Sequence, residues 1–366
     1  MTERRCSKVM VMAGGTGGHV FPALAVAEVL RDRGVAVTWL GTRRGIESEL
    51  VPEHGFSIDF IDVEGVRGRG LMKLLKAPFV LMKSLWQSIK VIRSQQPDVV
   101  LGLGGFASGP GGVAARMLRL PLVIHEQNAI AGTTNSLLAT IASRVLEAFP
   151  GALSRGEWVG NPVRKEIEAL PLRKDIGAVD DTPLRLLVLG GSLGAAAINQ
   201  QMPKALALLA DDSQLNVIQP EVRHQCGRAH QADTESAYEA AGVKASVEPF
   251  IADMAEAYGW ADVVICRAGA LTVAELTAAG VGALLVPYPH AIDDHQTKNG
   301  EWLVEQKAAL LMQQSELTPE TLATQIVEWS ADRTQLQSMA VNARKMAKGE
   351  VAESVADICM EVCRGQ

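Results

Sequence analysis

Short runs of apolar residues alternate along this chain with longer segments that have the periodicity of amphipathic helices. This alternation is typical of βαβ units, which assemble into parallel sheets. It predicts a set of strands in each half of the chain. They are Lys8–Met12, Val35–Leu40, Ser57–Ile61, Asp98–Leu101, Leu122–His125 and Arg144–Leu146, followed by Leu184–Leu189, Leu215–Gln219, Ala245–Glu248, Asp262–Ile265, Ala283–Val286 and Ala309–Met312.

The two halves begin alike. Lys8–Gly18 and Arg185–Gly194 each have the pattern of a strand, a glycine-rich turn and the start of a helix. We therefore expect an α/β protein of two doubly wound Rossmann-like domains that face each other across a cleft, with ligands at the carboxyl ends of the strands. The chain has helical character after Thr318, and a final helix over Glu350–Val362 could pack on either domain.

Composition narrows the class of protein. A length of 366 residues suits two domains, and 48% hydrophobic with 21% charged residues is a globular composition. The net charge of −6 argues against a nucleic-acid-binding protein. Five cysteines without a CxxC motif favour a reduced, cytosolic chain. We expect neither a signal peptide nor a transmembrane span.

Three glycine-rich turns follow predicted strands: Gly14–His19, Gly104–Gly109 and Gly190–Gly194. The N-terminus of a helix has unpaired N–H groups and partial positive charge, so such a turn is a ready site for an anion. One turn alone is weak evidence, because many such turns are simply tight connections. Three of them, distributed over both halves, favour a ligand that contains phosphate.

A dinucleotide fits the sequence less well than other phosphate ligands. A Rossmann NAD site needs an acidic residue at the end of its second strand, and here that strand is followed by Thr42-Arg43-Arg44. The two arginines leave NADP, and therefore an oxidoreductase, as an alternative. No Walker lysine follows any of the glycine-rich turns, which argues against ATP hydrolysis of the P-loop kind.

The second half contains a candidate site for a ribose. Cys266–Glu275 is a turn that leads into a helix, with Glu275 in the early turns of that helix. Its carboxylate is suited to accept hydrogen bonds from two vicinal hydroxyls, while the backbone N–H groups of Ala270–Thr272 face a phosphate. The alternative is that Glu275 only stabilises the start of its helix.

Six segments are distinctive when taken together: Gly14–Ala23, Gly104–Pro110, His125–Asn128, Val159–Arg164, Gly190–Ser192 and Arg267–Glu275. Through them the chain resembles, from about Val9 to its last helix, the MurG family of peptidoglycan N-acetylglucosaminyltransferases, which have the two-domain GT-B fold. Two departures are visible. Leu193 stands where the family usually has Gln, and His290–Gln296 differs from some members in length and charge.

The resemblance implies an inverting transfer of N-acetylglucosamine from UDP-N-acetylglucosamine to lipid I, an undecaprenyl-diphosphate-linked muramyl pentapeptide. The product, lipid II, contains a β(1→4) link. The implied binding residues are Thr16, Gly17 and Gly18 at the donor, Asn128 and Gln296 at sugar hydroxyls, Arg164 and Ser192 at UDP, the backbone of Ile251 at uracil, and Ala270, Leu271, Thr272, Val273, Ala274 and Glu275 at diphosphate and ribose.

The resemblance also implies how the domains divide the work. Residues 1–163 would form an acceptor and membrane-docking domain, onto which the last helix, about 349–366, packs back. Residues 164–348 would form the UDP-sugar donor domain. The expected partners are the two substrates, an anionic membrane surface and complexes for cell-wall synthesis, without nucleic acid. The expected location is peripheral, at the cytoplasmic face of the bacterial inner membrane, and no cofactor is expected.

An inverting displacement needs a base for the acceptor hydroxyl and stabilisation of the departing diphosphate. His19, at the end of the first glycine-rich turn, is the first candidate base because histidine titrates near neutral pH. Glu126, which follows an apolar strand, is the second candidate. The chain has no Asp-x-Asp motif, so we expect no metal. The charge of the leaving group would then fall to helix N-termini, Ser192 and Arg164.

One segment has a charge pattern of its own. Residues 66–96 contain seven of the chain's 35 basic residues and none of its 41 acidic ones. Pro78 suits the first turn of a helix there. One stripe of that helix is expected in the core: Leu81, Leu85, Ile89 and Ile92. A second stripe mixes aromatic and basic side chains, which with Leu75 upstream is typical of a surface that docks on anionic lipid: Phe79, Lys83, Trp86, Lys90 and Arg93.

Other interpretations stay open on the residues alone. The basic stripe could be a solvated face with half-buried aromatic side chains. Besides a membrane-docked glycosyltransferase, the sequence allows an NADP-dependent oxidoreductase, a UDP-N-acetylglucosamine epimerase of the same fold, or a nucleotide-binding module without catalysis.

Overall fold

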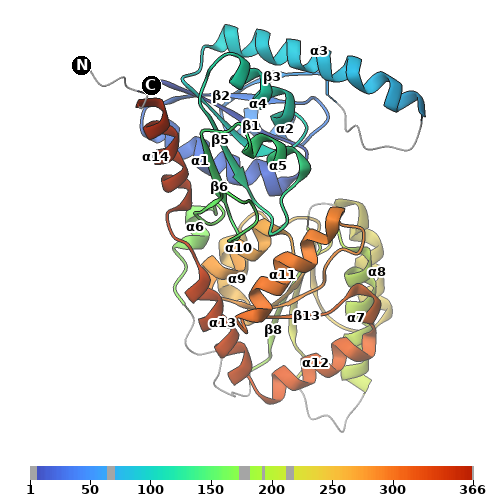
Figure 1. Cartoon of the computed structure of the whole chain (residues 1–366). Helices are drawn as coiled ribbons and strands as arrows, with labels where there is room; N and C mark the ends of the chain where they lie inside the picture. Colours follow the sequence, from blue (N-terminus) through green and yellow to red (C-terminus); the bar gives the residue numbers. More distant parts are fainter. Residues whose placement is uncertain (1–5, 64–70, 173–181, 192–193, 212–217, 365–366) are drawn as a thin grey trace. The chain divides into compact units, whose positions relative to one another are not determined.

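The computed structural model describes residues 6–63, 71–172, 182–191, 194–211 and 218–364, and of residues 71–77, 211 and 292 it describes the backbone alone. The chain divides into two compact units. One contains Met1–Arg164 and Glu350–Gln366, and the other contains Lys165–Gly349. Each unit is built on a parallel sheet flanked by helices (Figure 1). The prediction of two Rossmann-like α/β domains is confirmed.

The first unit contains a seven-stranded sheet in the order β3-β2-β1-β4-β5-β6-β7, and all its strand pairs are parallel. The strands are β1 (Lys8–Ala13), β2 (Ala36–Gly41), β3 (Ser57–Phe60), β4 (Val99–Gly104), β5 (Leu122–Glu126), β6 (Arg144–Glu147) and β7 (Glu157–Trp158). The helices are α1 (Gly17–Asp32), α2 (Glu47–Glu53), α3 (Leu71–Gln95), α4 (Ser108–Met117), α5 (Thr133–Ala139) and α14 (Val351–Arg364).

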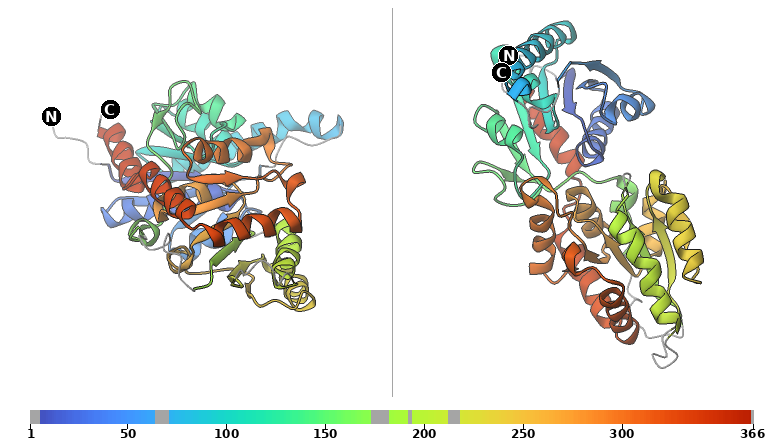
Figure 2. Two further views of the ribbon diagram at one scale, coloured as in Figure 1. Left: turned by 90° about the horizontal axis from the view of Figure 1, so that it is seen from below. Right: turned by 90° about the vertical axis from the view of Figure 1, so that its right-hand side faces the viewer.

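Strand β1 shows why both faces of the first sheet are covered by helices. Val9, Val11 and Ala13 belong to an apolar cluster with α1 and α14. Met10 and Met12 belong to a second cluster with residues of α3, α4 and α5. All five side chains are fully buried, as expected for a central parallel strand. Helix α14 is therefore part of the core of the first unit, where it lies beside α1 (Figures 1 and 2).

The second unit contains a six-stranded parallel sheet in the order β10-β9-β8-β11-β12-β13. The strands are β8 (Arg185–Leu189), β9 (Glu221–Gln225), β10 (Ser246–Glu248), β11 (Val263–Cys266), β12 (Gly282–Leu285) and β13 (Ala309–Leu311). The helices are α6 (Lys165–Glu168), α7 (Ala196–Asp211), α8 (Gln231–Ala240), α9 (Met254–Trp260), α10 (Ala270–Ala279), α11 (His295–Glu305), α12 (Pro319–Ala331) and α13 (Thr334–Met346), with short 3₁₀ segments at Arg228–His230, Ile292–Asp294 and Gln314–Glu316.

Both sheets have a topological switch point beside their first strand. β1 lies between β2 and β4, and β8 lies between β9 and β11. In open α/β sheets, ligands bind outside the carboxyl ends of the strands at such a point. The predicted glycine-rich turns follow β1, β4 and β8, and the turn that begins at Arg267 follows β11. The sequence motifs therefore occupy the switch points of their respective sheets.

Strand β9 requires a correction. The predicted strand Leu215–Gln219 is wrong, because Ile218 and Gln219 lie in no strand, residues 215–217 lie outside the described residues, and the strand is Glu221–Gln225. The buried side chains of β9 include polar ones, since His224 and Gln225 are 0% and 5% exposed. A strand whose buried residues are partly polar does not appear as an apolar run in the sequence. Strand β7 has no predicted counterpart because both its residues are exposed.

Helix α3 departs from the prediction in two ways. It begins at Leu71, so Pro78 lies inside the helix and not in its first turn. The preceding residues are good helix formers, and the helix continues through the proline although an internal proline removes one backbone hydrogen bond and crowds the preceding turn. Of the stripe expected in the core, Ile92 is buried and Leu85 and Ile89 pack against the same cluster, whereas Leu81 is 44% exposed. Ser84 and Ser88 are also fully buried on this helix. In the described parts of the chain, no helix combines the length and apolar character needed to cross a bilayer.

Candidate active site

His19 lies in the first turn of α1, immediately after the glycine-rich turn that follows β1. Its ring is half-buried, and its Nδ1 lies 2.8 Å from Oε1 of Gln127, the residue that follows β5. A Cβ at Gly104 would lie 2.9 Å from Nδ1 of His19. Glycine at position 104, where φ is +111°, therefore leaves the space that the imidazole occupies.

The turns after β1 and β4 pack backbone against backbone. Gly105 has a φ of +84°, and a side chain there would overlap the backbone of Gly14. The hydroxyl of Ser108 lies within hydrogen-bond distance of the carbonyl oxygens of Met12 and Gly104, at 3.0 and 2.7 Å, and donates its one hydrogen between them. These contacts hold the two turns together around His19.

A buried carboxylate that the sequence analysis missed holds the first turn. Glu47 is 0% exposed. It accepts hydrogen bonds from the backbone N–H of Gly15 at 2.9 Å, the N–H of Thr42 at 3.0 Å and the hydroxyl of Thr42 at 2.8 Å. The sequence signal was an acidic residue at the start of a helix, which has many ordinary explanations. Its partner in the turn lies 32 residues away in the chain.

Glu126, the second candidate base, is 1% exposed and ends β5. Its Oε1 accepts hydrogen bonds from the backbone and side-chain N–H groups of Asn128, at 2.9 and 3.3 Å. Its Oε2 accepts from the N–H of Gly132 at 3.1 Å and from Asn135 at 2.9 Å. Four donors satisfy both oxygens of this buried carboxylate and indicate a role in shaping the β5–α5 connection.

The other predicted residues of the first unit lie around the same strand ends. Thr16 is exposed and caps α1, whose first residues are Gly17 and Gly18. Asn128 is half-buried beside Glu126. Arg164 ends the first of the two segments that form the unit, and its guanidinium carbon lies 6.0 Å from the ring centre of Phe21 in α1.

In the second unit, α10 begins at Ala270 after a Gly269 cap. Its first turn contains no acidic residue, and the glycine cap has no side chain to occupy the N–H groups, so Ala270, Leu271 and Thr272 begin the helix as a potential anion site. Val273 and Ala274 follow, and Glu275 is 6% exposed one turn further on. Oε2 of Glu275 accepts a hydrogen bond from the hydroxyl of Tyr258 in α9 at 3.0 Å.

The remaining predicted residues of the second unit lie after β8, β10 and β12. Ser192 and Leu193, between β8 and α7 in the sequence, lie outside the described residues. The side chain of Ile251 is 2% exposed. Gln296, near the start of α11, accepts a hydrogen bond from the backbone N–H of Tyr288 at 2.9 Å.

Arg267, like Glu47, has a structural role that the sequence did not reveal. It follows β11 and donates hydrogen bonds to the carbonyl oxygens of Val286 and Pro287, both at 3.1 Å, and to Oε1 of Gln314 at 2.7 Å. Burial lowers its pKa from the ordinary value. The arginine thus joins the connections after β11 and β12 and fixes the start of α10.

Helix α3 presents an exposed apolar surface with basic residues in it. Phe79, Met82 and Trp86 are 79%, 72% and 64% exposed. Nζ of Lys90 lies 5.8 Å from the ring centre of Trp86, and Lys83 forms an exposed ion pair with Asp62 at 2.8 Å. We refer to Phe79, Met82, Lys83, Trp86 and Lys90 as the α3 patch. Leu75 lies in the same helix, but its side chain is outside the described residues.

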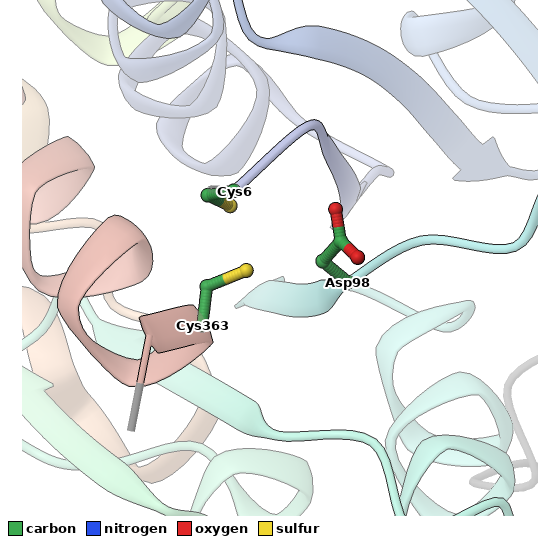
Figure 3. A group of neighbouring side chains, drawn as sticks. All are labelled: Cys6, Asp98 and Cys363. Atoms are coloured by element: carbon green, nitrogen blue, oxygen red, sulfur yellow. The ribbon is translucent and has the colours of Figure 1, made fainter. Parts of the chain in front are cut away.

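A cluster of thiols lies at the opposite, amino ends of β1 and β4 (Figure 3). Ligand atoms of Cys6, Asp98 and Cys363 lie within 4.8 Å of one another, the one such group of metal-binding side chains in the described ranges. Oδ2 of Asp98 accepts three hydrogen bonds from Ser7 and Lys8, and burial raises the pKa of the Cys6 thiol. Structural zinc sites use four ligands, so the cluster is better explained as packing between the start of β1 and the end of α14.

The fold, with a glycine-rich turn at the switch point of each sheet, is that of a two-domain glycosyltransferase of the GT-B type. The chain belongs to glycosyltransferase family 28: residues 9–147 match the family's N-terminal domain and residues 185–355 match its C-terminal domain. The resemblance to the MurG family is confirmed by the individual relatives.

Two curated relatives have the name UDP-N-acetylglucosamine--N-acetylmuramyl-(pentapeptide) pyrophosphoryl-undecaprenol N-acetylglucosamine transferase. The one from Nitrosococcus oceani is 54% identical over 98% of this chain and 99% of that protein. The one from Cellvibrio japonicus is 55% identical over 98% of this chain and 99% of that protein. The crystal structure of MurG from Acinetobacter baumannii is similar with a TM-score of 0.83, at 42% identity over 97% of this chain and 99% of that one.

Proposed function

We propose that the protein transfers N-acetylglucosamine from UDP-N-acetylglucosamine to lipid I, which yields lipid II for peptidoglycan synthesis. The observation that carries this proposal is the identity of 54% over nearly the whole of both chains to a relative with that name. The same relatives disfavour the NADP-dependent oxidoreductase and the epimerase. The geometry of the two sheets supports a division of roles between them.

The second unit is the better place for the nucleotide. The N-terminus of α10 offers backbone N–H groups and partial positive charge to a diphosphate. Glu275, in the next turn of the same helix, would accept hydrogen bonds from the ribose hydroxyls. The backbone at Ile251 would bind uracil, and Gln296 with Asn128 the hydroxyls of the sugar. Arg164 and Ser192 would add donors to the departing UDP.

The first unit would supply the base. In this mechanism the 4-hydroxyl oxygen of the acceptor attacks the anomeric carbon of N-acetylglucosamine, and the bond from that carbon to UDP breaks. The hydroxyl proton passes to His19, and UDP departs with the bonding electrons. One displacement inverts the α-linked donor to a β(1→4) product. Glu126 is the weaker candidate for the base because its oxygens already accept four hydrogen bonds.

The direct experiment uses radiolabelled UDP-N-acetylglucosamine and a short-chain analogue of lipid I. We expect labelled disaccharide product and an equal amount of UDP, formed only when the acceptor is present. Epimerised donor in the absence of acceptor would favour the epimerase. Oxidation of NADPH, or a thermal shift with NADPH and none with UDP, would favour the oxidoreductase.

We further propose that the α3 patch docks the protein on an anionic membrane surface, where a lipid-linked acceptor resides. Three large apolar side chains are more than half exposed on one helix, and exposed apolar surface of this kind often marks an interaction site. Basic residues along the same helix would add attraction to anionic headgroups of about 1 kcal/mol each, which salt weakens. The proposed location is therefore peripheral, on the cytoplasmic face of the inner membrane, where complexes for cell-wall synthesis could form.

Vesicle binding tests the docking surface. The double variant Phe79→Ser and Trp86→Ser should lose sedimentation with vesicles that contain phosphatidylglycerol, and should lose activity on long-chain lipid I in bilayers. Activity on the short-chain acceptor should stay near that of the wild type. Leu208→Ser, which removes a 40% exposed leucine from α7 of the second unit, is the matched control. Equal loss of both activities, or normal vesicle binding, would place the docking surface elsewhere.

A further inference from the structure

His19 is the first member of a chain of hydrogen bonds that ends on the backbone of Gly160. Nδ1 of His19 lies 2.8 Å from Oε1 of Gln127. Nε2 of Gln127 lies 2.9 Å from the carbonyl oxygen of His125 and 3.1 Å from Nδ1 of the same residue. Nε2 of His125 lies 2.8 Å from the carbonyl oxygen of Gly160. Carbonyl oxygens only accept, so the direction of each bond follows from chemistry.

The carbonyl oxygen of His125 decides the orientation of the Gln127 amide. The amide atom of Gln127 that lies 2.9 Å from this oxygen must be the nitrogen, because only the NH₂ group can donate a hydrogen bond to a carbonyl. The reversed amide would place two oxygens against each other. Nε2 of Gln127 therefore faces His125, and Oε1 faces His19. Because Oε1 only accepts, the hydrogen of that bond belongs to Nδ1 of His19.

His125 leads to the same assignment from the other end of the chain. The carbonyl oxygen of Gly160 accepts, so Nε2 of His125 donates. The ring is 0% exposed, and burial lowers the pKa of His125 below its ordinary value, which keeps the imidazole neutral near pH 7. Its Nδ1 then has a lone pair that accepts the second N–H of Gln127. One set of tautomers satisfies every member of the chain.

We propose that Gln127, supported by His125, is a positioning residue that holds His19 in the tautomer with hydrogen on Nδ1 and so leaves the lone pair of Nε2 for the acceptor hydroxyl. The catalytic part of this inference rests on the proposed function, whereas the tautomer is a property of the protein without substrate. When Nε2 takes a proton, the bond from Nδ1 to Gln127 becomes charge-assisted and stabilises the imidazolium. The other tautomer would present an N–H to the hydroxyl and could not accept its proton.

Nitrogen-15 NMR of the histidine side chains reads the tautomer directly. The His19 signals are assigned by their loss in His19→Ala. In the wild-type protein we expect neutral His19 with hydrogen on Nδ1. Gln127→Leu removes the acceptor, so we expect mixed tautomers and a kcat about 10- to 100-fold lower, with the KM for the donor unchanged.

Gln95→Met is the matched control. Gln95 also lies in the first unit and donates a side-chain hydrogen bond, to Asp59 at 2.8 Å, without contact to His19. This variant should keep the wild-type tautomer and kcat.

Two results would overturn the proposal: neutral wild-type His19 with hydrogen on Nε2, or a Gln127→Leu protein with unchanged tautomer and kcat. The wild-type spectrum decides the tautomer even where Gln127→Leu does not fold. A changed tautomer with unchanged kcat would overturn the catalytic part and, with it, His19 as the base. Absence of any transferase activity in a wild-type protein with the expected tautomer would instead reject the proposed function.

Discussion

The two sheets have closely related strand orders, yet they differ in the groups that bond to the N–H groups of the loops at their carboxyl ends. In the first unit, buried carboxylates accept hydrogen bonds from loop N–H groups: Glu47 from Gly15, Glu126 from Gly132, and Glu147 from Gly151 and Leu153. In the second unit, helix α10 begins at a glycine cap with no side-chain hydrogen bond to its first turn. Helix α1 of the first unit likewise has no acidic residue in its first turn, so the contrast lies in the carboxylates that bond to the loops of the first unit.

This difference indicates which unit is suited to an anion. N–H groups that already bond to an internal carboxylate are not available to a phosphate, and the carboxylate itself repels one. Glu47 instead holds the glycine-rich turn that precedes His19. The N-terminus of α10 keeps its positive potential for a ligand. The comparison favours our proposal that the diphosphate binds in the second unit and that proton transfer takes place in the first.

The largest expected effect is on kcat, from a change at His19 in the first unit. His19→Ala should lower kcat by about 10²–10⁴-fold, as for loss of a general base. The donor Kd, measured by calorimetry, should stay within a factor of two, because the proposed diphosphate site lies in the other unit. Near-normal turnover would pass the role of base to Glu126 or to no side chain.

The next largest effect concerns the carboxylate that holds the first turn. Glu47→Ala should reduce the free energy of unfolding by about 2–4 kcal/mol, because two buried donors of Thr42 and the half-buried N–H of Gly15 lose their acceptor. Urea denaturation measures this change. Glu49→Ala, which removes an exposed carboxylate from the same helix, should stay within about 0.5 kcal/mol. Similar losses in the two variants would show that Glu47 does not support the turn.

The second unit has its own carboxylate to test. Glu275→Ala should weaken UDP binding by about 10- to 100-fold, because the ribose loses a charged acceptor worth about 1.5–3 kcal/mol. Tyr258→Phe removes the hydroxyl that bonds to Glu275 but keeps the carboxylate, so it should bind UDP more tightly than Glu275→Ala. Unchanged affinity in a folded Glu275→Ala protein would dismiss the ribose role.

Each unit also contains one fully buried histidine, and this shared feature predicts a dependence of stability on pH. Burial lowers the pKa of His224 to about 4 and also lowers that of His125. As the pH falls below 6.5, the unfolded state takes up the proton first. The stability is therefore complete above pH 6.5 and decreases toward pH 4.

For His224 the loss between pH 6.5 and 5 is about 2 kcal/mol. Denaturant unfolding at several pH values measures it. His224→Gln should be less stable at pH 7 because the bonds to Tyr238 and Asn199 change, but its stability should decrease less between pH 6.5 and 5. An equally steep decrease would assign the pH dependence to other groups.

The fold was predictable where burial is apolar. Strands such as β8, β11 and β12 contain uninterrupted buried apolar residues, and their apolar runs are visible without a structure. Strand β9 could not be predicted in this way, because its buried residues include His224. The hydrogen bonds that make the burial of His224 favourable come from Asn199 and Tyr238, on two different helices. Burial of a polar side chain depends on partners that only the folded chain brings together.

The candidate site divides in the same way. The glycine-rich turns, His19 and Glu275 stand in local motifs, so the sequence alone identifies them as candidates. The residues that orient these groups lie outside the local motifs. Gln127 lies 108 residues from His19, and Glu47 lies 32 residues from Gly15. Sequence patterns mark groups that perform chemistry, whereas the hydrogen bonds that position these groups depend on the packing of distant strands.

The most direct test of the division of roles is hydrogen–deuterium exchange with UDP as the only ligand. UDP contains the diphosphate and ribose but no transferable sugar, so its footprint marks the anion site itself. We predict that the largest protection falls on the amides of Ala270–Glu275, and that Gly14–His19 changes less. The largest protection at Gly14–His19, with none at the start of α10, would contradict the assignment of the diphosphate to the second unit.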